Sequence, residues 1–274
     1  MVEKKTNRFL LGVIGIFSAV IFLAPFYLAV INSLKTQKGF LIDVIGLPGK
    51  YFTLKNYAEA FIKLDFIRSA SNSLFITVTA IVLIIVFASM AAWMLVRTKT
   101  KLSMFIFFMF SAAMLIPFQA VMLPLVRIMG RINLLNPGGI IFMYLGFGAP
   151  LSVMLYHGFV KSVPVEIEEA AIIDGCSKFQ VFWRVVFPLL KPISVTVSIL
   201  NAMWIWNDFL LPQLVINKPE WQTIPLKMFY FFGQFSKRWD LGLAGLIIAM
   251  LPIILFYLAM QKHIIKGVMQ GSIK

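Results

Sequence analysis

Long apolar runs alternate with short polar segments along most of the chain. We place six such runs at about residues 9–31, 72–96, 102–126, 139–159, 186–211 and 241–260. Each run has 20 residues or more. A helix of that length, rising about 1.5 Å per residue, crosses the roughly 30 Å apolar core of a bilayer. The pattern therefore predicts an all-α polytopic membrane protein with six transmembrane helices.

Composition supports the membrane assignment and excludes other classes. The chain is 60% hydrophobic and only 13% charged, whereas soluble domains are about 45–50% apolar. Its net charge of +14 would suit a nucleic-acid partner, but the basic residues are spread over every loop and form no stripe, so we expect no nucleic-acid binding. Basic loops facing anionic lipid account for the charge. The single cysteine, Cys176, excludes an internal disulfide and is expected to be a small buried residue.

The apolar runs divide the chain into three parts. Residues 1–71 hold an N-terminal cytoplasmic segment, a first span that we read as uncleaved, and a long outer loop. Residues 72–262 hold a core of five spans, with a polar segment at 164–188, and residues 263–274 form a cytoplasmic tail. Three residues of the third run indicate irregular backbone, which must face protein or water rather than lipid; they are Pro117, Gln119 and Pro124.

Basic residues near the span ends set the expected orientation. Arg97, Lys99 and Lys101 crowd the short link between the second and third runs, which favours the cytoplasm under the positive-inside rule. Total counts over the alternate loops nearly balance and do not decide. We therefore expect a multi-pass protein of the cell membrane, with both termini and the polar segment in the cytoplasm.

The polar segment at 164–188 concentrates acidic residues. Four of the chain's 11 lie in it: Glu166, Glu168, Glu169 and Asp174. Acidic residues after Pro164 favour the start of a helix, and a glycine at Gly175 favours its end. A second helix is expected from near Ser177, with Phe179 and Phe182 on one face. The segment therefore predicts a helix-turn-helix with a glycine corner.

Around this corner the sequence resembles the EAA loop of ABC importer permeases. The match is Glu169-Ala170-Ala171, three residues, Gly175, nine residues, Val185, one residue and Phe187-Pro188. Val185 stands where the family usually has Ile, and Phe187 where it usually has Leu. Other segments resemble the carbohydrate branch of maltose/multiple-sugar permeases: Asn72-Ser73-Leu74, Ile116-Pro117-Phe118, Pro124-Leu125, Trp206-Asn207-Asp208-Phe209-Leu210, and the tail from Gln261 to Lys274.

The resemblance implies an ABC importer permease fold and ATP-driven import of a sugar or oligosaccharide. It also implies a second permease subunit, two ATP-binding cassette ATPase subunits and an extracellular solute-binding protein. Because ATP and Mg²⁺ would lie on the ATPases, no cofactor is expected on this chain. The family's coupling loop sits in a groove of the ATPase, and the matching residues here are Glu169, Ala170, Ala171, Asp174 and Gly175. We add Phe179 because its shape suits a cleft.

A candidate substrate pathway lies near the end of the fifth run. Asn201, Trp204 and Asn207 are three residues apart, so they share one helical face. They could line a sugar pathway, or they could supply interhelical hydrogen bonds and an interfacial aromatic belt. Asp208 is assigned to hydrogen bonding near the outer mouth. Gln119 could touch substrate, although satisfying broken backbone is the reading that we favour.

Several chemistries are absent from the sequence. There is no G-x-x-x-x-G-K-[ST] run, no H-E-x-x-H and only two histidines, so we expect neither a catalytic residue nor a metal ligand. Ion-coupled carriers usually place ionisable groups near mid-membrane, whereas His157 and Asp208 lie near run ends. A stand-alone secondary carrier and a non-transporting scaffold are therefore disfavoured alternatives. Glycerol-phosphate import, a closer alternative, would need additional basic residues lining the path inside the spans, and the runs contain none except Lys191 near the start of the fifth.

Overall fold

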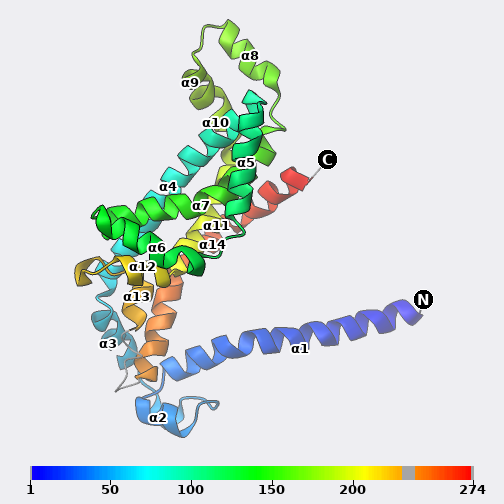
Figure 1. Ribbon diagram of the computed structural model, residues 1–274. Coiled ribbons are helices and arrows are strands. Elements are labelled where there is room, and N and C mark those ends of the chain that lie inside the picture. The colour runs from blue at the N-terminus through cyan, green and yellow to red at the C-terminus, as the bar shows by residue number, and fades with distance from the viewer. Residues whose placement is uncertain (1, 230–237, 273–274) are drawn as a thin grey trace. The chain divides into compact units, whose positions relative to one another are not determined.

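The computed structural model describes residues 2–229 and 238–272, with side chains described for residues 10–229 and 238–259. This part of the chain is built from helices and contains no strand beyond an isolated bridge between Lys35 and Phe52. The all-α prediction is therefore confirmed (Figure 1). The chain divides into two compact units, which are residues 1–66 with 227–252 and residues 67–226 with 253–274.

The first unit holds four helical segments before residue 66 and the start of the C-terminal helix. These are α1 (Val2–Ser33), α2 (Gln37–Ile42), η1 (Gly49–Tyr51), α3 (Lys55–Lys63) and the first part of α14 (Trp239–Ser272). Ala60 and Leu64, at the end of α3, form a small buried core with Leu241 and Ala244 of α14. The segment that the sequence suggested was a long mixed loop thus contains short helices.

The buried Lys35 fastens the turn after α1. Its Nζ donates to the Asp43 carbonyl oxygen at 2.7 Å, and Asn56 donates to the carbonyl oxygens of Ser33 and Lys35. The backbone N–H groups of Gly46 and Ile45 donate to the Asp43 carboxylate and lower its pKa.

The second unit contains most of the helices. They are α4 (Phe66–Thr98), α5 (Lys101–Ala113), α6 (Phe118–Arg131), α7 (Pro137–Val160), α8 (Val165–Ile173), α9 (Lys178–Val181), η2 (Phe182–Val186), α10 (Phe187–Leu189), α11 (Lys191–Asn207), α12 (Leu210–Val215) and η3 (Pro219–Trp221). The short α13 (Ile224–Met228) crosses the boundary between the units. Helix α4 begins at Phe66, earlier than the Asn72 expected from the sequence.

Small residues let the helices of this unit approach closely, as in other membrane bundles. Ala80, Ala88 and Ala92 recur along the buried face of α4. Gly148 of α7 lies so close to Ile84 of α4 and Asn201 of α11 that a Cβ there would meet their side chains at 2.5 and 2.7 Å. Glycine at this position therefore permits α4, α7 and α11 to meet.

The third and fifth predicted spans are each broken rather than continuous. Helices α5 and α6 meet at 105°, and the segment ending at Leu189 meets α11 at 75°. Pro117 has no N–H and disfavours helical backbone at Ile116, which explains the break before α6. Within the described residues, four helices are long and apolar enough to cross a membrane, and up to six spans result when each bent pair counts as one. The third predicted span, residues 102–126, is thus a bent pair of helices, and the irregular backbone expected at Pro117 lies at the break between them.

The fifth predicted span also ends earlier than residue 211. Helix α11 stops at Asn207, and Asp208 adopts extended backbone with ψ of 127°. The Asp208 Oδ1 then accepts from the Leu210 N–H at 3.0 Å, at the start of α12. This hydrogen bond between residues two apart stabilises the turn that separates α11 from α12.

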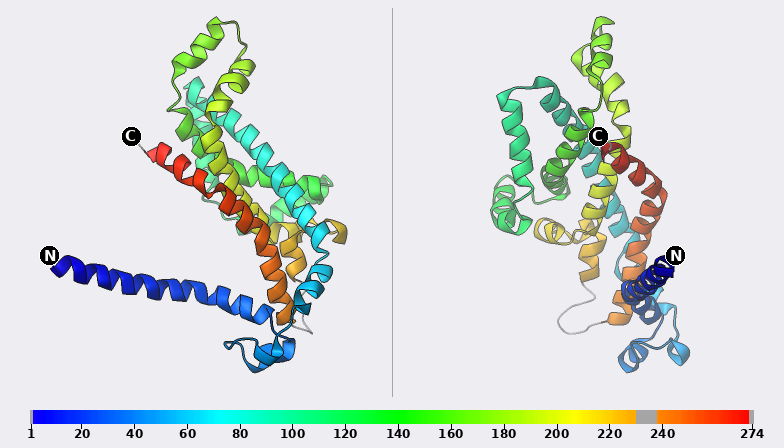
Figure 2. Two further views of the ribbon diagram at one scale, coloured as in Figure 1. Left: turned by 180° about the vertical axis from the view of Figure 1, so that it is seen from behind. Right: turned by 90° about the vertical axis from the view of Figure 1, so that its right-hand side faces the viewer.

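Helices α8 and α9 stand beyond the ends of α4 and α5, at one end of the second unit (Figures 1 and 2). They belong to the polar segment that the sequence singled out. Helix α14 continues to Ser272, so it covers most of the predicted tail; Ile273 and Lys274 lie outside the described residues.

Candidate functional site

The polar segment forms a helical corner whose first arm is α8. Pro164 precedes the helix, and Glu166 and Glu168 lie in its first turn, where negative charge is favourable. At the other end the Cys176 N–H donates to the Ala171 carbonyl at 2.9 Å, and the Gly175 N–H donates to the Ile172 carbonyl at 3.0 Å. This is the Schellman arrangement that ends many helices. Gly175 has a φ of +86°, which requires glycine or a strained substitute.

The second arm of the corner is α9, which begins with a reciprocal cap. The Gln180 N–H donates to Ser177 Oγ at 3.3 Å, and the Ser177 N–H donates to Gln180 Oε1 at 2.8 Å. A π-helical turn, η2, follows and leads into α10. π-Turns inside helices are uncommon and often accompany functional sites. We call the whole segment, residues 164–189, the corner loop.

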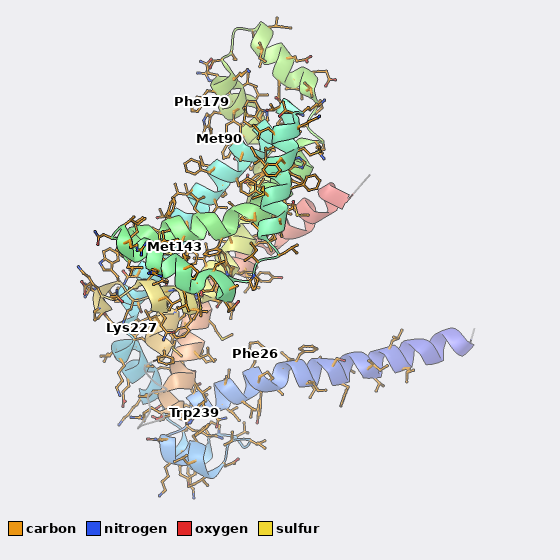
Figure 3. The ribbon with its side chains drawn as sticks, in the orientation of Figure 1. Phe26, Met90, Met143, Phe179, Lys227 and Trp239 are labelled. Carbon is orange, nitrogen blue, oxygen red and sulfur yellow. The ribbon has the colours of Figure 1, made fainter. Side chains whose placement is uncertain are left out.

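The outer surface of the corner loop is apolar with acidic residues beside it. Ile173 is 85% exposed and Phe179 is 63% exposed. Among the residues predicted to dock, Glu169, Ala170, Asp174 and Gly175 are exposed and Ala171 is half-buried. Figure 3 places Phe179 on α9, next to α8. Cys176 is half-buried and packs against the core, so it is less enclosed than expected.

Phe182 does not share an exposed face with Phe179, contrary to the sequence-based expectation. Phe182 is only 1% exposed and packs against Trp93 of α4, with ring centroids 5.4 Å apart. Three helical residues leave an offset of about 60° between two side chains. That offset is enough for Phe182 to enter the core while Phe179 stays outside.

A buried ion pair fastens the corner loop to α4. Arg97 donates through Nη2 and Nε to Glu168 Oε1, at 2.7 and 3.0 Å, and through Nη2 to the Val163 carbonyl at 2.9 Å. Trp93 Nε1 donates to Glu168 Oε2 at 2.9 Å. Both carboxylate oxygens are therefore satisfied. We call Trp93, Arg97, Glu168 and Phe182 the α4 anchor.

Trp93 holds both arms of the corner loop. Its indole N–H binds Glu168 of α8, and its ring packs on Phe182, which follows α9. The loop is thus attached to a helix more than 60 residues away in sequence as well as to its own neighbours α7 and α11. Removing one partner of such a buried pair costs about 3–5 kcal/mol, because a charge is left without compensation.

Sequence reasoning missed the α4 anchor. One signal was available, because Trp93 and Arg97 are four residues apart and must face the same way on a helix. Arg97 was instead interpreted together with Lys99 and Lys101, as evidence for the orientation of the spans in the membrane. Glu168 was grouped with Glu169, although the first is buried and the second exposed.

The residues of the predicted substrate pathway are not gathered at one site. Asn201 is buried, and its Nδ2 donates to the Val197 carbonyl at 2.9 Å and to Ser152 Oγ of α7 at 3.2 Å. Asn207 is exposed, and its Nδ2 donates to the Met203 carbonyl at 2.7 Å. Gln119 is exposed in the first turn of α6.

Trp204 lines a cavity of about 870 Å³ between α4, α5, α6 and α7. Its ring packs edge-to-face on Tyr144, with centroids 5.4 Å apart. The Tyr144 hydroxyl donates to Asp208 Oδ2 at 2.9 Å. The side chains that line the cavity are almost all apolar, and Met143 of α7 is one of these side chains (Figure 3). Such walls offer few partners to sugar hydroxyls.

No group of three or more His, Cys, Asp or Glu side chains that could hold a metal ion occurs in the described part of the chain.

Comparisons with known proteins identify the family. Residues 84–270 match the family model described as "Binding-protein-dependent transport system inner membrane component". The chain is 45% identical, over 100% of both chains, to the probable starch degradation products transport system permease protein AmyC of Thermoanaerobacterium thermosulfurigenes. It is 33% identical to the multiple sugar-binding transport system permease protein MsmG of Streptococcus mutans, over 99% of both chains.

Another relative and a solved structure are also similar to this chain. The melibiose/raffinose/stachyose import permease protein MelC of Bacillus subtilis is 35% identical over 91% of both chains. Among solved structures, the crystal structure of a bacterial ABC transporter involved in the import of the acidic polysaccharide alginate matches with a TM-score of 0.77 and 24% identity. That match covers 95% of this chain and 96% of the other, and it supports the permease fold. The chain therefore belongs to the family of binding-protein-dependent transport system inner membrane components.

Proposed function

We propose that the protein is the permease subunit of an ABC importer that moves a sugar or oligosaccharide across the cell membrane. The observation that carries the coupling part of this proposal is the corner loop, which is exposed on its outer surface and anchored on its inner surface to α4. The sugar class is supported by relatives named for starch degradation products, multiple sugars and melibiose/raffinose/stachyose.

The docking surface in this proposal is the outer face of the corner loop. Glu169, Ala170, Ala171, Asp174 and Gly175 would contact an ATPase subunit, and Phe179 would fill a cleft in it. Aromatic side chains such as Phe are enriched at protein–protein interfaces. ATP and Mg²⁺ bind to the ATPases, and this chain supplies no catalytic residue.

The rest of the assembly follows from the same proposal. A second permease subunit completes the pathway, two ATPase subunits bind at the cytoplasmic face, and an extracellular solute-binding protein delivers the sugar. Both termini and the corner loop lie in the cytoplasm. The loop's outer face must be in water or against protein there, because charges such as Glu169 and Asp174 are costly in lipid.

Force from the ATPases reaches the spans through two connections. One runs along the chain from the corner loop through α10 into α11, where the helix bends by 75°. The other runs through Arg97 and Glu168 into α4, which is a single helix over Phe66–Thr98. Movement of the loop would therefore rock α4 and α11 together and switch the pathway between inward-open and outward-open states.

The experiment that tests coupling is Gly175→Asp, compared with Asn133→Asp. Both substitutions place a new carboxylate at a positive-φ corner, with φ of +86° and +57°, but only the first lies in the corner loop. Gly175→Asp should insert in the membrane normally, lose most sugar uptake and copurify with less ATPase. Asn133→Asp should behave as wild type. Full uptake with undiminished ATPase in Gly175→Asp would overturn the proposal.

Substrate class is tested with proteoliposomes that contain the complete transporter and its binding protein. Malto-oligosaccharides, α-galactosides and glycerol phosphate are offered in turn, and stimulated ATP hydrolysis is measured. Stimulation by one of the saccharides supports the sugar class. Stimulation by glycerol phosphate alone would overturn it, and uptake without any ATPase subunit would overturn the importer assignment.

A further inference from the structure

A second cavity, of about 800 Å³, lies where four helix ends meet beside the corner loop. It is formed by the end of α4, the start of α5, the end of α7 and the start of α8. Neither the docking surface nor the substrate pathway uses it. We propose that this cavity binds the phosphate headgroup of an anionic phospholipid from the cytoplasmic leaflet. The proposal rests on the proposed function, because that function places this end of the helices at the cytoplasmic face.

The cavity carries positive charge that the fold leaves unneutralised. Lys99, Lys101 and Lys161 line it and are exposed. None of the three forms an ion pair or a side-chain hydrogen bond with another described residue. The single acidic residue in the lining is Glu166. Three lysines against one glutamate leave a surplus of positive charge, which suits a phosphate diester.

Arg97 also lines the cavity, but its positive charge is already paired with a carboxylate of the protein. Its guanidinium is paired with Glu168 and also donates to the Val163 carbonyl. The headgroup site is therefore made by the lysines, and Arg97 is the one residue of the α4 anchor that lines it. This separation matters, because the lysines can be replaced without breaking the anchor.

The start of α5 adds to the positive field. This helix has 13 residues and begins at Lys101, inside the cavity. Thr100 and Ser103 cap it reciprocally, with the Ser103 N–H donating to Thr100 Oγ1 at 3.1 Å. The positive end of the helix dipole thus points to the same space as the lysines, an arrangement that favours phosphate.

The remaining walls suit the apolar part of a lipid. Leu95, Met104, Phe107 and Phe108 line the cavity, and Met104 and Phe108 are 58% and 60% exposed. A site with cations at one edge and exposed apolar side chains at the other matches a headgroup joined to acyl chains. Basic pockets between transmembrane helices on the cytoplasmic side bind anionic lipid headgroups in this way. A free phosphate ion would make no use of these apolar walls.

Pro164, Val165 and Glu166 at the start of the corner loop also line the cavity. A lipid bound there contacts the corner loop at the segment that connects α7 to α8. The bound headgroup is therefore placed to steady the loop between the membrane and the α4 anchor. We expect transport in membranes lacking anionic lipid to be less tightly coupled to ATP hydrolysis.

The test uses the purified complete transporter in nanodiscs made from equal amounts of phosphatidylglycerol and phosphatidylcholine. Native mass spectrometry after release counts the lipids retained. The wild type should retain phosphatidylglycerol in preference to phosphatidylcholine. The K99Q/K101Q/K161Q variant should bind phosphatidylglycerol about 100-fold more weakly, since each lysine near an anionic surface contributes roughly a factor of five.

The matched control is K38Q/K55Q/K63Q, which removes three exposed lysines from the first unit. It should retain phosphatidylglycerol as the wild type does. Equal retention by K99Q/K101Q/K161Q and wild type, an equal loss in the control, or displacement of the lipid by inorganic phosphate would overturn the proposal. ATPase copurification is measured in the same samples, so a failed lipid site is distinguishable from a failed docking surface.

Discussion

At the scale of single residues, Glu168 and Glu169 show how neighbours can serve different purposes. Successive residues on a helix point about 100° apart. Glu168 is therefore buried against Arg97 and Trp93, while Glu169 faces outward. Composition identified an acidic group here, but only packing separates the carboxylate that holds the loop from the one available to a partner.

Arg97→Gln should destabilise the protein strongly. The substitution leaves Glu168 buried without its cation, which costs about 3–5 kcal/mol. The double variant Arg97→Gln/Glu168→Gln should recover much of this loss, because no unpaired charge remains. Thermal unfolding of the purified complex measures both.

Glu169→Gln is the matched control for the anchor. Because Glu169 is exposed, its loss should change unfolding by less than about 0.5 kcal/mol yet reduce ATPase copurification. Equal stability of Arg97→Gln and wild type would show that the anchor does not hold the loop.

Gly148→Val should disturb the meeting of α4, α7 and α11. A Cβ at this position would lie 2.5 Å from Ile84 Cδ1 and 2.7 Å from Asn201 Oδ1, and overpacking of this kind costs about 1–3 kcal/mol. Gly146→Val is the control, since no atom lies within 4 Å of a Cβ at Gly146. Thermal unfolding should separate the two variants, and identical melting curves would contradict the close approach.

At the scale of elements, the sequence predicted features that depend on neighbouring residues better than features that depend on contacts between distant parts of the chain. The apolar runs gave α4 and α7 to within about six residues at each end, whereas α1 begins before its run and α14 continues to Ser272, well past residue 260. The caps of the corner loop are readable in Asp174-Gly175 and in Ser177 with Gln180. Pro117 indicated irregular backbone, but the 105° angle between α5 and α6 depends on packing. The partnership of Trp93 with Phe182 joins distant parts of the chain, so no local pattern could give it.

Ser177→Ala should loosen α9 while leaving the spans intact. The serine accepts from the Gln180 N–H in the cap of α9, and loss of such a cap costs about 1 kcal/mol. Phe179 would then be less firmly oriented, so ATPase copurification should fall several-fold while membrane insertion stays normal. Ser177→Asp should restore it, because aspartate caps equally well.

The control for this element is Ser162→Ala, which removes an exposed hydroxyl that donates to the Phe159 carbonyl. Its ATPase copurification should match that of the wild type. A Ser177→Ala variant with unchanged copurification would mean that the order of α9 is unimportant for docking.

At the scale of the whole molecule, the broken spans limit what can surround them. Non-helical backbone at membrane depth must face protein or water, and the break before α11 falls at Leu190, which is buried within this chain. The exposed apolar side chains of α5 and α6 fit lipid or a second permease subunit. Sequence could give the number of runs, but not the angles at which two of them are broken.

Orientation is the whole-molecule property on which coupling depends, and it can be measured with single cysteines. In a Cys176→Ser background, Ile173→Cys places a thiol on the outer face of the corner loop, at a position 85% exposed. Lys38→Cys places one after α1, at the far end of the first span. A membrane-impermeant maleimide should label Ile173→Cys only in inside-out vesicles and Lys38→Cys only in right-side-out vesicles. Added ATPase subunits should protect Ile173→Cys and leave Lys38→Cys reactive. Labelling of Ile173→Cys from the outside would put the corner loop beyond the reach of any ATP-driven partner, because ATP is available only on the cytoplasmic side.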